Sequence, residues 1–335
     1  MFALAKRKPP RPRKDFASCS GCGLCLLVCP VWRRTHDLGL TPLGRAKALQ
    51  FGAQAADLAD SAHSCTLCAA CEPVCPEEIG LVAMTLGLRS RLLEPATAQD
   101  LRSRLDAQAA RPLAPQSFAA AALLPGPALR GRPATLARAA SLLGGAGAVS
   151  VAADDGADIA LALEAGLPLP APRLDRFLQP LRRIKTVFVN DGLLLRQLRI
   201  WLPHAKLVSL GAALSGLAAV RGALRASDLY VIEPRAYHAD YQRLVGHYDR
   251  LRADAGCAFN LDLQRIAIPA AARSLPQKLG LQPLDDGVQL RWILQGRSVK
   301  RIVVEDCDDG AAFAQVSHLP VVHLADLADD GTAAA

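Results

Sequence analysis

The sequence of 335 residues predicts a multidomain α+β protein, in which a helical N-terminal domain precedes two α/β modules with parallel strands. Three observations lead to this prediction. Eight of the ten cysteines lie within residues 19–75, among strong helix formers. Beyond residue 115, short β-branched or leucine runs alternate with helical stretches, which is typical of parallel sheets. This second half also repeats itself at an interval of about 110 residues.

Changes in composition divide the chain into four parts. Residues 1–14 are a basic flexible arm, and residues 15–112 are the helical domain. Residues 113–225 and 226–330 are the two α/β modules. The boundary between the helical domain and the first module falls in the stretch 95–115, which is rich in Ala, Arg and Pro.

Three helices are predicted within the first domain. Thr41 and Pro42 form a cap and first-turn pair for a helix that continues to about residue 50. A second helix covers residues 81–93, and Thr97 with Asp100 opens a third. Arg45 and Lys47, in the first helix, could offset negative charge on a cofactor, although solvated surface cations are the favoured interpretation.

Seven strands and five helices are predicted in the second half from its apolar runs. The strands are residues 120–124, 148–152, 186–190, 206–210, 229–233, 301–305 and 321–324. The helices are residues 133–143, 173–183, 192–201, 239–254 and 287–295. A group of side chains at a predicted helix is interpreted as packing and surface residues instead of a site; they are Tyr237, His238, Tyr241, His247 and Tyr248.

The internal repeat pairs segments of similar sequence. KTVFVNDG at 185–192, then a helix and KLVSLGAAL at 206–214, parallels KRIVVEDCD at 300–308, then a helix and PVVHLADLA at 320–328. The opening strands AALLPGP at 121–127 and LYVIEPR at 229–235 correspond in the same way. The similar offsets favour a duplicated module over coincidence.

The motif CxxCxxCxxxCP occurs twice, and this repeat is the ligand pattern of a bacterial protein with two 4Fe-4S clusters. Three thiolates of one unit can bind three iron corners of a cubane, and the fourth cysteine ligates the other cluster. Pro30 and Pro76 help to fix where that fourth cysteine points. The first predicted ligand set is Cys19, Cys22, Cys25 and Cys75, and the second is Cys65, Cys68, Cys71 and Cys29.

Two other uses of these cysteines remain as alternatives. Structural zinc needs only two CxxC pairs for a tetrahedral site, so it does not account for the third cysteine and the following CP. A disulfide framework requires an oxidising compartment, and the sequence shows no secretory segment. Iron-sulfur ligation is therefore the favoured interpretation.

CSGCGLCLLVCPVWRRT, TPLGRAKAL and CTLCAACEPVCPEEIGLVAMTLGLRSRL resemble one known family over about residues 15–94. It comprises the iron-sulfur subunits of glycolate oxidase, anaerobic glycerol-3-phosphate dehydrogenase, lactate-utilisation complexes and heterodisulfide reductase. The resemblance implies an α-helical ferredoxin-like dicluster domain that relays electrons within a larger dehydrogenase or reductase. It also implies that the duplicated half corresponds to two CCG-type cysteine-rich modules.

The second half departs from that family because it has no Cys-Cys pair and holds only Cys257 and Cys307. Pro127 and Gly192 fall about where the first module would carry a ligand cysteine. Two thiols cannot hold a four-iron cluster, so we expect degenerate modules without metal chemistry. Buried structural cysteines are the favoured interpretation, and Cys307, where a strand should end, is the candidate for a function.

Composition and charge narrow the partners. The net charge is +8, with a basic cluster in residues 1–14; a solvated arm is favoured over docking to an acidic partner or an anionic membrane surface. The basic residues elsewhere are interspersed with acidic ones, which disfavours nucleic acid as a partner. No glycine-rich nucleotide-binding motif follows a predicted strand, which disfavours a bound nucleotide. Without a long apolar run, we expect a cytoplasmic protein that can lie peripherally at the inner face of a membrane through its partners.

The predicted function is that of a non-catalytic electron-transfer subunit of an oxidoreductase complex. Two 4Fe-4S clusters would relay single electrons from a partner, a flavoprotein dehydrogenase or another redox subunit, to a quinone-reducing membrane subunit or another carrier. One alternative is a reductase whose C-terminal modules still act on a disulfide or organic substrate. The other is a scaffold or assembly subunit. We assign no catalytic residue.

Overall fold

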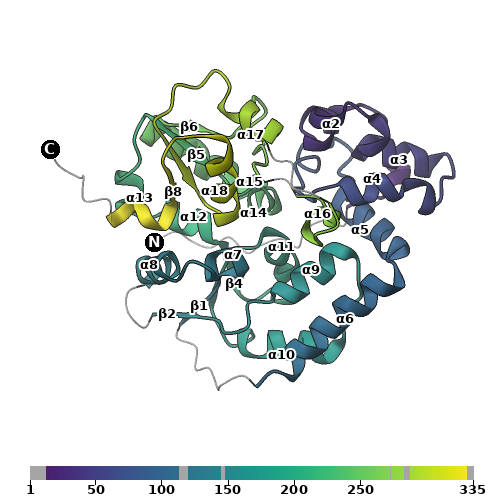
Figure 1. Cartoon of the computed structure of the whole chain (residues 1–335), viewed down its shortest axis with the longest axis horizontal. Coiled ribbons are helices and arrows are strands. Elements are labelled where there is room, and N and C mark those ends of the chain that lie inside the picture. Colours follow the sequence, from purple (N-terminus) through teal and green to yellow (C-terminus); the bar gives the residue numbers. More distant parts are fainter. Residues whose placement is uncertain (1–12, 113–119, 145–147, 272, 283–286, 330–335) are drawn as a thin grey trace.

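The computed structural model describes residues 13–112, 120–144, 148–271, 273–282 and 287–329 (Figure 1). Most of the predicted basic arm lies outside these residues, as does the stretch 113–119 at the predicted boundary between the helical domain and the first module. In Figure 1 the helical N-terminal part lies beside two α/β parts, one coloured mainly teal and the other green to yellow.

The N-terminal part is built from short helices separated by cysteine-bearing loops. Thr41 caps α3 as predicted, since its hydroxyl oxygen accepts a hydrogen bond from the Gly44 amide at 3.1 Å and Pro42 opens the helix. The α-helices are α1 (Leu24–Leu27), α2 (Pro30–Thr35), α3 (Pro42–Gln50), α4 (Ala59–Ser64), α5 (Leu81–Leu92) and α6 (Pro95–Ala110). Single 3-10 turns lie at Phe16–Ser18, Leu38–Leu40 and Ala56–Leu58.

Helix α6 begins earlier than predicted and belongs to the packing of the first α/β part. Glu94 precedes Pro95, which opens the helix two residues before Thr97, so the predicted start at Thr97 was wrong. Leu101 and Leu105 of α6 are buried in the same hydrophobic core as residues of α9 (Ala157–Ala165) and α10 (Ala171–Leu181). The stretch taken as a boundary is therefore largely a helix packed on the first sheet's helices.

Two four-stranded parallel sheets form the rest of the chain, and both have the same strand order. The first runs β2-β1-β3-β4 and the second β6-β5-β7-β8, so the segments paired by the sequence repeat occupy equivalent places. Seven of the strands were predicted; β6 was not, because two residues give no periodic signal. The strands are β1 (Ala121–Leu124), β2 (Val149–Val151), β3 (Thr186–Val189), β4 (Lys206–Ser209), β5 (Asp228–Val231), β6 (Ala258–Phe259), β7 (Arg301–Val304) and β8 (Val321–His323).

Helices follow nearly every strand, as parallel connections require. The helix predicted over 239–254 corresponds to α15 (Tyr241–Ala255), and a short separate helix, α14 (Pro234–Ala239), opened by Pro234, precedes it. The first module adds α7 (Gly126–Arg130), α8 (Pro133–Gly144), α11 (Gly192–Trp201), α12 (Leu210–Ser215) and α13 (Ala218–Gly222). The second has α14 (Pro234–Ala239), α15 (Tyr241–Ala255), α16 (Leu275–Lys278), α17 (Gly287–Leu294) and α18 (Cys307–Val316).

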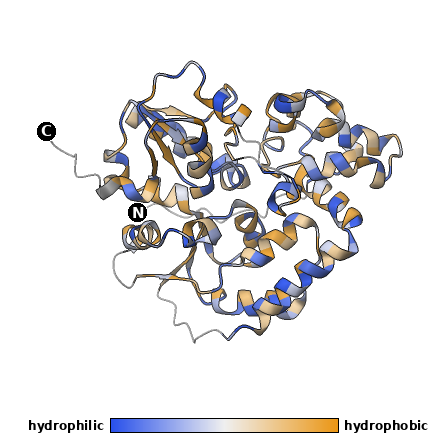
Figure 2. Cartoon of the chain, in the orientation of Figure 1, coloured by the Kyte–Doolittle hydropathy of each residue, from blue (hydrophilic) through white to orange (hydrophobic). Residues whose placement is uncertain are grey.

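The two modules share a hydrophobic core. Leu123 and Leu210 from the first module are buried in one cluster with Tyr230 and Tyr248 from the second. Hydrophobic and hydrophilic residues alternate along the helices in Figure 2, as expected where one face of each helix is buried. Within the described residues, no helix combines the length and the apolar character that crossing a membrane requires.

Candidate metal centre

The two cysteine loops have the same backbone conformation at equivalent positions. Gly21 and Gly23 of the first loop have φ of 83° and 77°. Leu67 and Ala69, at the same places in the second CxxCxxC unit, have φ of 52° and 61°. The left-handed region suits glycine and costs other residues about 1 kcal/mol or more. The second loop therefore adopts the curve of the first at a cost that its surroundings must offset.

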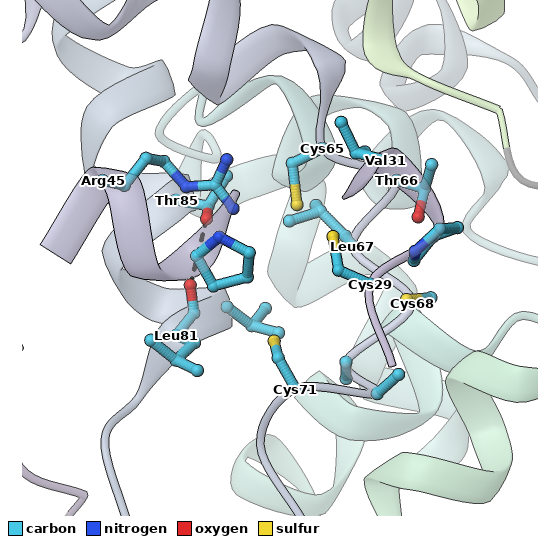
Figure 3. Close-up of a pocket in the computed structure, with 15 residues that line it drawn as sticks. Cys29, Val31, Arg45, Cys65, Thr66, Leu67, Cys68, Cys71, Leu81 and Thr85 are labelled. Atoms are coloured by element: carbon cyan, nitrogen blue, oxygen red, sulfur yellow. Dashed lines mark hydrogen bonds between the residues drawn. The ribbon is translucent and has the colours of Figure 1, made fainter. Parts of the chain in front are cut away.

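Cysteines from both motifs line one cavity, which Figure 3 shows in close-up. Cys65, Cys68 and Cys71 come from the second loop, and Cys29 comes from the first motif, at the residue before α2. Arg45, Leu81 and Thr85 stand beside them in the figure. The four cysteines are those predicted as the second ligand set.

The other four cysteines lie together nearer the surface. Burial, together with the neighbouring thiols of Cys29, Cys19, Cys22 and Cys75, raises the pKa of Cys25 to about 12. Cys75 is thus a neighbour of Cys25 although 50 residues separate them. Cys22 is exposed, and Cys19, Cys25 and Cys75 are partly buried. In the second set, Cys29 and Cys68 are buried.

Backbone amide and hydroxyl donors lie near the cysteines of the second set. The backbone amides of Trp32 and Val31, in the first turn of α2, act to lower the pKa of Cys29 against the effect of its burial. The Ala70 amide and the Thr66 hydroxyl act in the same direction on the pKa of Cys68. Such donors stabilise thiolates and, around iron-sulfur clusters, contribute to the reduction potential.

Two buried arginines place positive charge at this cavity. Arg45 is 1% exposed and donates to the Ser61 carbonyl at 2.6 Å; the interpretation of this residue as a solvated surface cation was wrong. Arg89, fully buried, donates to the Cys65 carbonyl at 2.5 Å. Burial acts to raise the pKa of Cys65, but Arg45 and Arg89, together with the Leu67 amide and the Thr85 hydroxyl, outweigh it and the net pKa is lowered. Lys47 donates to the Cys19 carbonyl at 2.8 Å, beside the first set.

The remaining thiols of the cavity resist ionisation together. Burial and, to a smaller extent, the neighbouring thiols raise the pKa of Cys68 to about 12 and that of Cys71 well above its usual range. Several thiolates in one buried place need positive charge to compensate them. Iron ions would supply it, since iron-sulfur clusters bind cysteine as thiolate.

The residues present fit a four-iron cluster. Within the described residues, no three His, Cys, Asp or Glu side chains converge as ligands of a single metal ion would. A cubane binds its four thiolates at four separate iron corners, so they lie further apart than the ligands of one ion. Four thiols around one cavity, with amide donors and cations beside them, have the donor chemistry that such a cluster requires.

The strand ends of the α/β half are packed with side chains. Glu305, 3% exposed, accepts hydrogen bonds from the hydroxyls of Tyr230 at 2.7 Å and Tyr248 at 2.6 Å. Gly192 lies against the neighbouring module, where a Cβ would be 2.2 Å from the Ala236 nitrogen. The glycine at the place of an expected ligand cysteine is therefore required by close packing.

The two cysteines of this half are buried and apart from both ligand sets. Cys307 opens α18 at the end of β7 and is 3% exposed, and burial raises its pKa to about 12. Cys257 is 4% exposed, and burial raises its pKa to about 11. A thiol with a raised pKa holds little thiolate and is a poor nucleophile.

Among the residues that touch the second cysteine loop, sequence reasoning missed two that come from the second α/β module. Arg235 donates to the Thr66 carbonyl at 2.5 Å, and His238 lies 2.7 Å from the Cys68 carbonyl. Both belong to α14, far along the chain, so no local spacing links them to the cysteines. The histidine lay in a group interpreted as packing residues.

Comparison with known proteins agrees with the iron-sulfur prediction for the N-terminal part. Residues 15–79 match the family described as the 4Fe-4S dicluster domain. Over 86 residues the chain is 33% identical to a protein of Escherichia coli (strain K12) called "Uncharacterized electron transport protein YkgF". That alignment covers 24% of this chain and 18% of the relative, so the match spans less than a fifth of that protein. No solved structure matches.

Proposed function

We propose that this chain is an electron-transfer protein that holds two 4Fe-4S clusters and relays single electrons between redox partners. The observation that carries the proposal is the position of Cys29 in the cavity lined by Cys65, Cys68 and Cys71. This crossing of motifs is what two-cluster proteins use, because the fourth cysteine of each unit ligates the other cluster. The dicluster-domain match over residues 15–79 supports the same cofactor.

The chain's own residues would bind the clusters and adjust their potentials. When bound, a 4Fe-4S cluster takes up and gives back one electron at a time. The eight motif cysteines would hold the two clusters. Amide donors from α2 and the guanidinium groups of Arg45 and Arg89 stabilise negative charge at the second set, which favours the reduced state there.

The burial of the two sets suggests an order for the relay. Cys22 in the first set is exposed, whereas Cys29 and Cys68 in the second are buried. A partner protein can approach the first set most closely, so we assign the entry or exit of electrons to that set. The second set, enclosed by α5 and the α/β half, would hold the inner member of the pair.

The partners that fit this role are a flavoprotein dehydrogenase, or another redox subunit, on one side and a quinone-reducing subunit or other carrier on the other. Flavins can pass on single electrons, and one-electron clusters are suited to receive them. The resemblance to iron-sulfur subunits of dehydrogenases and the name of the relative, an electron transport protein, both favour such an assembly.

The catalytic alternative, a reductase site in the α/β half, has less support. Cys307 and Cys257 are buried with raised pKa values, and the strand ends are occupied by Glu305 and its tyrosine partners. Replacing both cysteines with serine should leave turnover of the assembled complex unchanged. A loss of turnover with normal iron content would favour the reductase.

Metal analysis of the anaerobically purified chain tests the proposal. We expect about eight iron and eight sulfide per chain, and magnetically coupled 4Fe-4S signals in the EPR spectrum of the reduced protein. Zinc in place of iron, or a folded chain that takes up no iron when reconstituted, would contradict it.

A further inference from the structure

The second cysteine loop lies between the two α/β modules. Leu67 and Ala69 pack in one hydrophobic cluster with Leu193 of α11, in the first module. Cys68 and Ala70 pack in another with Ile266, in the second module. Successive residues of the loop therefore contact different modules, so the α/β half forms walls of this site instead of only standing beside it.

Three carbonyl groups of this loop accept hydrogen bonds from buried or partly buried side chains. The Cys65 carbonyl accepts from Arg89 of α5 at 2.5 Å, within the N-terminal part. The Thr66 carbonyl accepts from Arg235 of α14, also at 2.5 Å. The Cys68 carbonyl is 2.7 Å from Nδ1 of His238, at the other end of α14. Two of the three contacts thus come from one short helix of the second module.

Each of the α14 side chains is itself held in place. Arg235 also binds both carboxylate oxygens of Glu164, at 2.9 and 3.0 Å, and the Glu164 side chain is 4% exposed. His238 is 4% exposed, and its Nε2 accepts a hydrogen bond from the Ala267 amide at 3.2 Å. Since Nε2 accepts, Nδ1 carries the ring proton and donates it to the Cys68 carbonyl. The ring cannot turn over without losing both bonds.

The loop needs this support because of its backbone. Leu67 and Ala69, on either side of Cys68, both have positive φ, whereas the first loop uses glycine at these places. Without outside contacts, the chain would favour releasing two such residues into ordinary conformations. The contact from His238 holds the peptide group between them.

We propose that α14 of the second α/β module positions the second cysteine loop, and that His238 is the residue that fixes Cys68 as a ligand. His238 and Arg235 are positioning residues, because they act through the loop backbone and not on the cofactor. Groups that orient metal ligands in this way typically change metal affinity by roughly 10- to 100-fold when removed. The inference rests on the proposed function, since it assumes that the second set binds a cluster.

Three variants of the full chain separate this role from a general effect on folding. His238→Ala removes the donor to the Cys68 carbonyl. His238→Asn keeps it, because the amide nitrogen of Asn, like Nδ1, is two bonds from Cβ and carries hydrogen. His247→Ala is the matched control: this histidine is in the same module and pairs with the Ser215 hydroxyl at 2.9 Å, away from the cysteine loop.

Iron, sulfide and the EPR spectrum of the reduced chain are measured for all three, with circular dichroism for folding. We expect His238→Ala to lose about half of its iron and the coupling between the two cluster signals, while the asparagine and control variants match the wild type. If His238→Ala does not fold, the asparagine variant is compared with His238→Gln, whose amide lies one bond further out. We then expect iron loss only in the glutamine variant.

Two results would overturn the inference, and they are distinguishable from failure of the proposed function. In the first result, wild type holds both clusters and His238→Ala has the same iron content, EPR line shape and potentials. This result would refute the role of His238 and leave the proposed function standing. Equal iron loss in His238→Ala and His247→Ala would do the same, since it would report instability. Wild type without iron would overturn the proposed function and the inference together.

Discussion

Replacing Gly192 with alanine should destabilise the α/β half at the contact between its modules. Gly192 opens α11, and a Cβ there would lie 2.2 Å from the Ala236 nitrogen, 2.4 Å from the Arg235 Cβ and 2.5 Å from the Arg235 carbonyl carbon. Two of these atoms are backbone atoms of the facing module, so a side-chain rotation cannot relieve the overlap. Helix α11 and the start of α14 must separate to accommodate one methyl group.

The expected cost lies at the upper end of the range for an overpacked site, about 3 kcal/mol. An unfolding entropy of about 2.1 cal/mol/K per residue gives roughly 0.7 kcal/mol/K for a chain of this length, if it unfolds as one unit. The melting temperature should therefore fall by about 4 °C. Gly222 is the matched control, because it ends α13 in the same module and a Cβ there would meet nothing within 4 Å.

Differential scanning calorimetry of wild type, Gly192→Ala and Gly222→Ala measures this difference. The control should change the free energy of unfolding by no more than about 0.5 kcal/mol. Equal melting temperatures for wild type and Gly192→Ala would refute the close packing of the modules. That result would also refute the argument that close packing requires a glycine at the position where a ligand cysteine was expected.

Two further perturbations test charges at particular buried residues. Burial raises the pKa of Glu305 to about 7, against an ordinary 4.5, despite the hydroxyl donors from its two tyrosine partners. The stability contributed by the protonated carboxyl is full below pH 4.5 and is lost as the pH rises through 7. The stability advantage of wild type over Glu305→Gln should therefore shrink by about 2.5 kcal/mol between pH 5 and pH 8. A difference that does not depend on pH would contradict this. Replacing Arg45 with methionine removes a positive charge beside Cys65. For a separation of about 8 Å between this charge and the electron on the cluster, and an effective dielectric constant near 20, the charge contributes roughly 2 kcal/mol, or about 90 mV, to the midpoint potential. One of the two EPR-monitored midpoint potentials should become more negative by that amount while the other stays, and equal shifts in both would contradict the placement of Arg45.

The parts of this protein that sequence reasoning predicted are those whose signals are local. The CxxCxxC spacing acts over seven residues, and the strands of the sheets are continuous apolar runs, so both can be recognised without tertiary contacts. The cap of α3 at Thr41 is equally local. Strand β6 was missed because two residues carry no period, and α6 began early because Pro95 decides the first turn.

The contacts around the second cysteine loop depend on residues distant in sequence. His238 is 170 residues from Cys68, and its pattern on the helix is that of a packing residue. The burial of Arg45 could not be predicted from the sequence of α3, because arginine occurs on both the buried and the exposed faces of helices. One signal was available: aligning the two motifs places Leu67 and Ala69 opposite Gly21 and Gly23, which predicts a loop that needs outside support.

The most direct test of the central claim is a reductive titration of the iron-loaded chain that counts electrons. An electron relay with two clusters should take up about two electrons per chain, in two reversible one-electron steps, and return both to an oxidant. Uptake of no electrons by a chain with full iron content, or reduction that cannot be reversed, would contradict the account.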